Sequence, residues 1–305
     1  MEQPRYRGRF APSPTGPLHF GSLVTALASW LEARAAGGDW LVRIEDLDPL
    51  REPPEATGQI LHSLDCHGLF PDEPVRFQSK CHDGYQAAIE QLLSQGKAYR
   101  CRCSRKELQQ HGGYHPTRCR DGQPAPGDTP YAIRFALNGE TCHWQDLLLG
   151  PQQQQVHEEL DDPVILRKEG FYAYQLAVVV DDIDQAITDV VRGSDLLEMT
   201  AQQQQIFQAL GATPPHWLHI PVIVNKQGQK LSKQTHAPAL NDAQPAANLT
   251  RALDALGQRP PQCLLTATVE EVLAWGRNHW QRHAIPLTSR QARGINPDTH
   301  LPADR

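Results

Sequence analysis

The chain has 305 residues, of which 39% are hydrophobic, and a formal net charge of −6. This length accommodates one large α/β domain with an inserted or appended part, and the acidic balance excludes binding of nucleic acid by bulk positive charge. No run of about 18 apolar residues and no apolar leader is present, so neither a membrane span nor a secretory signal is expected.

The chain opens with a predicted strand, a stiff loop and a helix. Residues 5–10 are expected to be extended, and the proline-rich residues 12–17 restrict the loop that follows. Apolar residues then recur at helical spacing over residues 23–36. Ser22 or Thr15 is expected to cap this helix. A helix N-terminus therefore follows a strand directly, and its free N–H groups and dipole attract an anion.

A histidine lies beside this predicted anion site. His19 stands one step before the helix, where its imidazole can donate a hydrogen bond to a phosphoryl oxygen. The alternative is an ordinary proline-rich turn. A second element far downstream favours the phosphate site, because Lys230-Leu231-Ser232-Lys233-Gln234 places two lysines in one loop.

The next elements predict a parallel sheet. Residues 39–46 indicate a buried strand that ends in acidic residues, and residues 53–64 and 84–93 have helical spacing. Strand, helix and strand in this order are typical of a parallel sheet, whose ligands lie at the carboxyl ends of the strands. We therefore expect Glu45 beside the loop of His19.

Three cysteines and a histidine predict a metal site. Cys101, Cys103 and Cys119 fall within 19 residues, and His115 lies four residues before the last of them. Three thiolates and one imidazole suit a tetrahedral zinc ion without an open position, which would make the ion structural. Three unlinked thiols are the alternative, and Tyr114 competes with His115 as fourth ligand. The remaining cysteines are scattered, which indicates reduced thiols and a cytoplasmic protein.

The later elements complete the predicted fold. Strands are expected at residues 129–135, 142–149, 163–168, 188–195 and 220–225, and helices at 105–110, 200–210 and 269–281, the last with a capping box from Thr268 to Glu271. Residues 152–155 are predicted as a polar loop, and residues 171–182 as a buried strand or helix. Asp181 and Asp182 at its end could bind a metal, but a helix cap in a solvated turn is the stronger prediction. No role is expected for the glutamines at 202–205.

Arg192 ends the strand predicted at residues 188–195. A guanidinium at the carboxyl end of a parallel strand can grip a small carboxylate. The alternative is a structural ion pair with Glu45 or Asp195.

These motifs, in this order, resemble the class I aminoacyl-tRNA synthetases and, within them, the glutamyl-tRNA synthetases. His19-Phe20-Gly21-Ser22 is similar to the family's first signature, with Ser22 for its last histidine, and Lys230-Leu231-Ser232-Lys233-Gln234 is similar to the second. Residues 41–48, 172–182 and 190–195 resemble further blocks of the family. The resemblance implies a Rossmann-type α/β catalytic domain that uses ATP with Mg²⁺ to activate L-glutamate as an adenylate.

The resemblance also implies roles for single residues, with His19 and Lys233 as catalytic residues. The implied ATP site comprises His19, Gly21, Ser22, Lys230, Ser232 and Lys233. The implied glutamate site comprises Arg9, Phe10, Ala11, Pro12, Ser13, Glu45, Tyr174 and Arg192, with the two arginines at carboxylates and Glu45 at the amino group. The family's zinc site falls on Cys101, Cys103, Cys119 and a tyrosine position that His115 occupies here.

The C-terminal part narrows the resemblance. Full glutamyl-tRNA synthetases continue into an anticodon-binding domain, for which the residues after Lys233 are too few. The chain therefore more closely resembles the truncated glutamyl-queuosine tRNA(Asp) synthetases, which transfer glutamate to queuosine at the wobble position of tRNA(Asp). A truncated enzyme that charges a tRNA 3′ end, or a non-catalytic relative that binds adenylate or tRNA, is the alternative.

The same resemblance implies four parts of the chain. Residues 1–98 and 161–240 would form the two halves of the catalytic domain, residues 99–160 a zinc-binding insertion, and residues 241–305 a short helical end. No heptad or exposed apolar stripe is present, which favours a monomer.

Overall fold

A computed structural model describes residues 5–103, 105–110, 118–121, 130–156, 161–225, 229–231, 237–288 and 290–291. In these residues the largest sheet has seven strands, which are β1 (Arg7–Phe10), β2 (Asp39–Ile44), β3 (Arg76–Phe77), β6 (Thr141–Asp146), β7 (Gly150–Gln155), β9 (Asp189–Gly193) and β10 (His216–Ile220). Their order is β3-β2-β1-β9-β10-β6-β7, and all neighbours are parallel except β6 and β7. The predicted Rossmann-type α/β class is confirmed.

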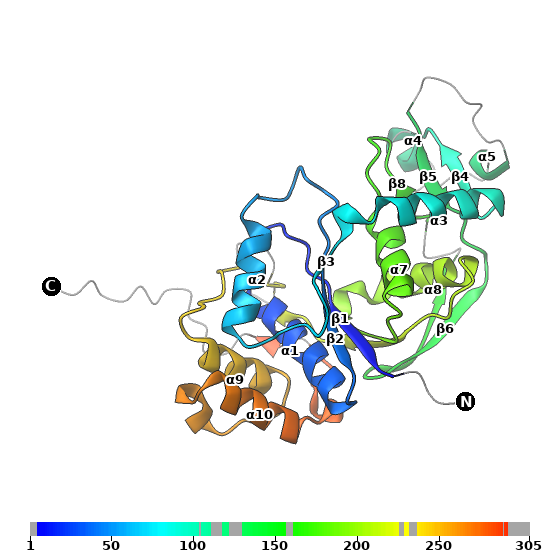
Figure 1. Ribbon diagram of the computed structural model, residues 1–305. Helices are drawn as coiled ribbons and strands as arrows, with labels where there is room; N and C mark the ends of the chain where they lie inside the picture. The colour runs from blue at the N-terminus through cyan, green and yellow to red at the C-terminus, as the bar shows by residue number, and fades with distance from the viewer. Residues whose placement is uncertain are drawn as a thin grey trace.

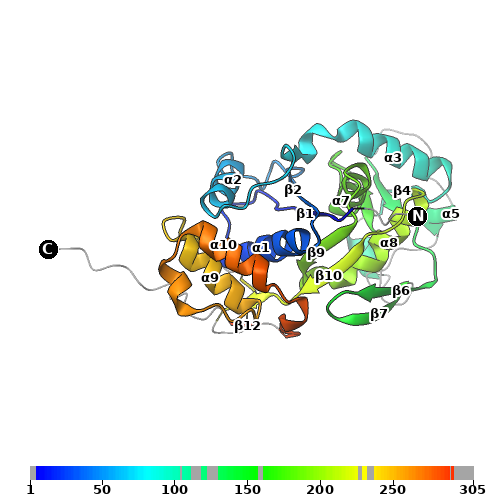
Figure 2. The same cartoon turned by 60° about the horizontal axis from the view of Figure 1, so that its bottom comes forward.

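Helices cover both faces of this sheet. One face carries α1 (Phe20–Ala35), α2 (Ala56–Cys66), α9 (Pro245–Ala255) and α10 (Val269–His279). The other carries α3 (His82–Ser94), α7 (Tyr174–Asp184) and α8 (Thr200–Ala209). Figure 1 shows α9 and α10 against α1, and Figure 2 shows the hairpin of β6 and β7 at the edge beyond β10. Each face therefore has its own hydrophobic core.

A second lobe is built on a three-stranded antiparallel sheet. Its strands are β4 (Ala98–Cys101), β5 (Ala132–Phe135) and β8 (Val164–Leu166), with the short helices α4 (Arg105–Gln110) and α5 (Arg118–Asp121) beside them (Figure 1). The other described elements are β11 (Ile223–Val224), β12 (Arg290–Gln291) and the 3₁₀ helices η1 (Gln78–Lys80), η2 (Ser194–Met199), η3 (Gln262–Thr266) and η4 (Arg282–Ala284).

Side chains alternate across the strands and give the large sheet two different faces. Val42 and Ile44 of β2 lie in the hydrophobic core against α1, whereas the intervening Arg43 is directed at α7. The same alternation in β9 and β10 places Arg192 and His219 on the other face from α1, where their side chains are hydrogen-bonded to each other. Buried polar groups are therefore concentrated on the α7 side of the sheet.

Most of the predicted elements are present, and the capping box is confirmed, with Thr268 Oγ1 accepting from the backbone N–H of Glu271 at 3.2 Å. The predicted loop at 152–155 is wrong, because these residues belong to β7 and pair with β6. Gln154 is buried while its neighbours are exposed, so the strand alternates without the apolar residues that would reveal it. No helix among the described residues combines the length and apolar character needed to cross a membrane.

Candidate active site

The strand order changes direction at β1, and Arg9, Glu45 and Arg192 of the predicted site lie near this point. β1 pairs with β2 on one side and with β9 on the other, all three parallel. The carboxyl ends of such strands flank a crevice in open α/β sheets. Arg9 near the end of β1 and Arg192 near the end of β9 lie on its two sides. The loop after β1 is tied to β2, since the N–H of Glu45 donates to the carbonyl of Pro12 at 3.0 Å.

His19 is the N-cap of α1. The helix begins at Phe20, earlier than predicted, so neither Ser22 nor Thr15 is the cap. Instead, Nδ1 of His19 accepts from the backbone N–H of Ser22 at 3.2 Å, and the Ser22 hydroxyl lies 3.2 Å from Nε2. A Cβ added at Gly21 would lie 3.2 Å from the imidazole, a tight contact that would press on the ring. The imidazole is thereby fixed over the first turn of the helix.

The segment that follows the lysine loop lies against this histidine turn, and the segment before the loop pairs with β11. On the near side, Lys230 forms a bridge with Val224, the second residue of β11. On the far side, Ala239 forms a bridge with His19, and the N–H of Leu240 donates to the carbonyl of Leu18 at 2.8 Å. Lys230 Nζ lies 2.5 Å from Asp195 Oδ2. Ser232 and Lys233 lie outside the described residues.

Arg9 and Arg43 share one buried carboxylate. Asp182 accepts from Nε of Arg9 at 3.0 Å and from its Nη2 at 3.2 Å, and from Nη1 of Arg43 at 2.7 Å. All three residues are buried. Burial alone would raise the pKa of Asp182, but the two guanidinium groups outweigh it and hold that pKa below its usual range. Nη1 of Arg9 has no hydrogen-bond partner among the described residues.

Glu45 is a buried carboxylate without a full set of partners. Burial raises its pKa to about 7, against the opposing effect of Arg43 and Arg9. Its Oε1 lies 3.6 Å from Nη2 of Arg43, too far for a hydrogen bond, and no group in the described part of the chain bonds to that oxygen. A buried carboxylate oxygen of this kind fits an ammonium group as its ligand.

Arg192 is buried and is held by uncharged acceptors. Its Nε donates to His219 Nε2 at 2.9 Å, its Nη1 to Gln203 Oε1 at 2.6 Å, and its Nη2 to Thr200 Oγ1 at 2.9 Å. Nη2 also donates to the carbonyl of Leu196 at 3.2 Å. Among the described residues it forms no ion pair, so the predicted alternative of pairing with Glu45 or Asp195 is wrong. The second N–H of Nη1 has no acceptor within hydrogen-bond distance among the described residues, and the phenol of Tyr174 lies beside the guanidinium.

Tyr174 lies among these charged groups, at the start of α7. Burial raises the pKa of its phenol, and Arg192 and Arg9 act in the opposite direction. The ring of Phe10, by contrast, is stacked on Trp40 in the core, with centroids 6.5 Å apart. Only the backbone of Phe10 is therefore available to a ligand.

The two predictions for the acidic pair and the glutamine run are wrong. Asp181 and Asp182 lie within α7 and are buried rather than solvated. Asp181 accepts from Tyr85 and Gln78, each at 2.8 Å. Gln203 is one of the acceptors around Arg192. A charged side chain within an apolar helix is a signal for a buried partner, and it could have identified Asp181 and Asp182.

His219 and Arg43 were missed by sequence reasoning. Each interrupts an apolar strand at a position whose neighbours point into the core against α1. Alternation alone therefore places the two side chains on the opposite face, together with Arg9 and Arg192. The alternation of side chains could be recognised in the sequence, but the residues that Arg43 and His219 bond to lie in distant segments.

The three predicted metal-binding cysteines come together in the second lobe. The Sγ atoms of Cys101, Cys103 and Cys119 lie within 4.8 Å of one another, and those of Cys103 and Cys119 are 3.4 Å apart. Ligands of one tetrahedral zinc ion have Sγ atoms about 3.8 Å apart, so the set fits such an ion. Arg120 ties the site to the body of the lobe through the buried Asp162. Tyr114 and His115 lie outside the described residues.

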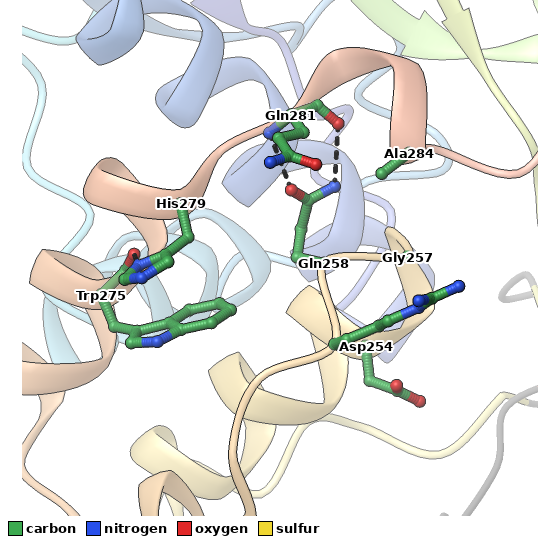
Figure 3. Close-up of a pocket in the computed structure, with 8 residues that line it drawn as sticks. Asp254, Gly257, Gln258, Trp275, His279, Gln281 and Ala284 are labelled. Carbon is green, nitrogen blue, oxygen red and sulfur yellow. Dashed lines mark hydrogen bonds between the residues drawn. The ribbon is translucent and has the colours of Figure 1, made fainter.

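A polar cavity of about 610 Å³ lies apart from these residues, in the C-terminal helices. Gln258 and Gln281 bond to each other across it, with the N–H of Gln281 donating to Gln258 Oε1 at 2.8 Å (Figure 3). Trp275 and His279 stack at 4.4 Å on its wall. None of the predicted site residues lines it.

Comparisons with known proteins show the family of the chain. Residues 5–249 match the family described as tRNA synthetases class I (E and Q), catalytic domain. The chain is 50% identical over 281 residues to the Glutamyl-Q tRNA(Asp) synthetase of Pseudomonas aeruginosa strain LESB58, covering 92% of this chain and 95% of the relative. It is 43% identical over 298 residues to that of Vibrio vulnificus strain YJ016, covering 96% and 97%.

A solved structure is similar over most of the chain. It is a glutamate tRNA ligase from Elizabethkingia meningosepticum CCUG26117 in complex with its amino acid, with a TM-score of 0.79 and 26% identity. The match covers 94% of this chain and 67% of that one.

Proposed function

The chain belongs to the class I tRNA synthetases of the glutamate and glutamine type, which are ligases, and from this premise we propose that it activates L-glutamate with ATP and transfers it to the queuosine of tRNA(Asp). The queuosine substrate follows from the names of relatives that match almost the whole chain. A synthetase that charges a tRNA 3′ end is not favoured for the same reason. Because the proposed substrate is a tRNA, we propose that the enzyme acts in the cytoplasm.

The observation that carries the proposal is the charge pattern at the ends of β1, β2 and β9. L-Glutamate has two carboxylates and one ammonium group. Among the described residues, Arg9 and Arg192 each have an N–H group without an acceptor, and Glu45 has a buried oxygen without a hydrogen-bond donor. Two guanidinium groups that can donate further hydrogen bonds and one carboxylate that can accept one complement the charged groups of glutamate, whereas a neutral side chain would leave one guanidinium unmatched.

We assign the ATP phosphates to the turn of His19, Gly21 and Ser22, closed by Lys230, Ser232 and Lys233. The α-carboxylate of glutamate attacks the α-phosphorus, the bond to the bridging oxygen breaks, and pyrophosphate leaves. His19 and Lys233 stabilise the charge that develops on the phosphoryl oxygens. Mg²⁺, which this class uses with ATP, would supply positive charge to the pyrophosphate.

Transfer of labelled glutamate to tRNA tests the proposal. We expect label to appear on tRNA(Asp) that contains queuosine and to stay there after the 3′-terminal adenosine is removed. The same tRNA without queuosine should stay unlabelled. Label that is lost with the 3′ adenosine would instead establish aminoacylation of the tRNA end.

The raised pKa of Glu45 predicts a pH limit on glutamate use. Above about pH 7 the carboxylate is ionised and pairs with the ammonium group, and below it the charge is lost. We expect kcat/KM for glutamate in ATP–pyrophosphate exchange to fall up to about tenfold per pH unit on acidification below that value. Glu45→Gln should remove this acidic fall in kcat/KM, whereas Glu270→Gln on the exposed surface of α10 should keep it. If kcat/KM still falls on acidification in Glu45→Gln, Glu45 is not the group whose protonation causes the fall.

We further propose that Cys101, Cys103, Cys119 and His115 hold one structural zinc ion in the insertion at residues 99–160. Cys101→Ser is expected to lose the zinc and to unfold at a lower temperature, because a closed tetrahedral site contributes directly to folding. Metal analysis and thermal melting measure this, with the exposed Cys263→Ser as control. Unchanged zinc content in Cys101→Ser would contradict the assignment.

A further inference from the structure

The surroundings of Arg192 differ from those of Arg9. Arg9 is paired with the carboxylate of Asp182, whereas the partners of Arg192 in the described chain are an imidazole, an amide, a hydroxyl and a carbonyl. A buried guanidinium without a carboxylate partner is unfavourable until an anion arrives. The positive charge of Arg192 is therefore left for the substrate to neutralise.

The imidazole at Nε of Arg192 has its tautomer fixed from behind. Nδ1 of His219 lies 2.6 Å from Asp146 Oδ2, and both side chains are fully buried. Because the Nε–H of Arg192 can only donate, Nε2 of His219 must accept, and the ring proton lies on Nδ1 and is donated to Asp146. Asp146 Oδ1 in turn accepts from the backbone N–H groups of Leu148 and Leu149, at 3.0 and 2.9 Å.

The electrostatics keep this arrangement in one state. Burial lowers the pKa of His219, and the nearby charge of Arg192 lowers it further. Asp146 acts in the opposite direction but does not outweigh them, so the ring stays neutral. Burial would raise the pKa of Asp146, but the hydrogen bonds from His219 and from the backbone outweigh it and lower that pKa. A neutral ring with its lone pair toward Arg192 is the result.

The amide at Nη1 of Arg192 is oriented in a similar way. Gln203 Nε2 donates to Gln175 Oε1 at 2.9 Å, and Gln175 Nε2 donates to Gln202 Oε1 at 2.5 Å. Gln202 Nε2 then donates to the carbonyl of Asp161 at 3.1 Å. Each nitrogen is turned toward the next amide, so Oε1 of Gln203 faces Arg192. The hydrogen-bond relay through His219 ends at the carboxylate of Asp146, and the relay through Gln203 ends at the carbonyl of Asp161. Neither relay places a negative charge directly against the guanidinium of Arg192.

We propose that Asp146 and His219 are positioning residues, which hold Arg192 in the orientation that binds the substrate carboxylate. The proposal deepens the proposed function and rests on it. The relay fixes the guanidinium plane through Nε and leaves one Nη1 N–H for the substrate. The reversed tautomer of His219 would set N–H against N–H and turn the guanidinium out of place.

Asp146→Asn reverses the relay while keeping the shape of the side chain. Its amide nitrogen donates to Nδ1 of His219 and moves the ring proton to Nε2, where it faces Arg192. We expect the KM for glutamate to rise about 10- to 100-fold, the KM for ATP to stay unchanged, and the preference for glutamate over glutamine to fall. A merely structural role would not separate the two substrates in this way.

Two variants of His219 keep the test decisive if Asp146→Asn fails to fold. His219→Gln offers an amide oxygen to Arg192 and should recover most of the glutamate affinity, whereas His219→Phe offers a ring of similar size without an acceptor and should not. Asp189→Asn is the matched control. It alters the pair of Asp189 and the exposed His216, 3.3 Å apart on β9 and β10, the strands of Arg192 and His219, and should leave glutamate use unchanged.

Nitrogen NMR of the wild-type protein reads the tautomer without reference to activity. We expect the proton on Nδ1 of His219, moving to Nε2 in Asp146→Asn. A wild-type ring protonated at Nε2, or a folded Asp146→Asn protein with unchanged glutamate KM and selectivity, would overturn the inference. Wild-type protein that shows no glutamate-dependent ATP–pyrophosphate exchange would overturn the proposed function itself, so the two failures are distinct.

Discussion

His19→Ala is expected to slow glutamate-dependent ATP–pyrophosphate exchange by about 10²–10³-fold, because a positioned donor to the reacting phosphoryl group is worth about 2–4 kcal/mol. The imidazole is fixed over the first turn of α1 by its bonds to Ser22, the residue that stands in place of the last histidine of the family's signature. The loss should appear mainly in kcat, since the donor acts on charge that develops in the transition state.

A cap substitution separates chemistry from folding at this position. Removing the N-cap side chain costs about 1 kcal/mol of stability, so His19→Ala is expected to be slightly destabilised as well. His19→Asn keeps an acceptor for the N–H of Ser22 and should restore that stability while the exchange rate stays low. His62→Ala, at an exposed position on α2, serves as the control. Recovery of the rate in His19→Asn would show that capping, not catalysis, is the role of His19.

Several strands of this fold and its two motifs could be predicted from local patterns, whereas the polar strand β7 and the buried polar networks could not. Residues 39–46 are apolar enough to predict β2, and the histidine and lysine motifs are recognisable by residue order alone. The partner of Arg9, however, is 173 positions away in Asp182. Such a pair depends on how α7 packs on the sheet, and periodicity gives the face of a residue but not its neighbour across the core.

The same limit applies to Arg192. Its position at the end of β9 could be predicted, and with it a role in binding a carboxylate. That its partners are neutral follows only from the tertiary contacts to β10 and α8, which bring in His219, Thr200 and Gln203. Glutamines are unremarkable in a sequence, and only their burial gives them meaning.

Asp182→Asn is expected to lower the free energy of unfolding by about 3–5 kcal/mol, because it leaves two buried guanidinium groups without their shared charge. The carboxylate accepts from Arg9 and Arg43 within 3.2 Å, and all three side chains are almost inaccessible to solvent. Arg9 would also lose its fixed orientation, so the KM for glutamate should rise. Urea unfolding and exchange kinetics measure the two effects.

Asp184→Asn is the matched control on the same helix. Its side chain is 63% exposed and pairs with Arg76 at 2.6 Å, and a solvated pair of this kind contributes at most about 1 kcal/mol. The pH dependence gives a second test. Because the pKa of Asp182 is lowered in the folded protein, its contribution is present above the ordinary carboxyl pKa of about 4 and is lost as the pH falls below it. The acid loss of stability should therefore be smaller in Asp182→Asn than in Asp184→Asn, and equal curves for the two variants would contradict the role of Asp182 as the carboxylate that holds both arginines.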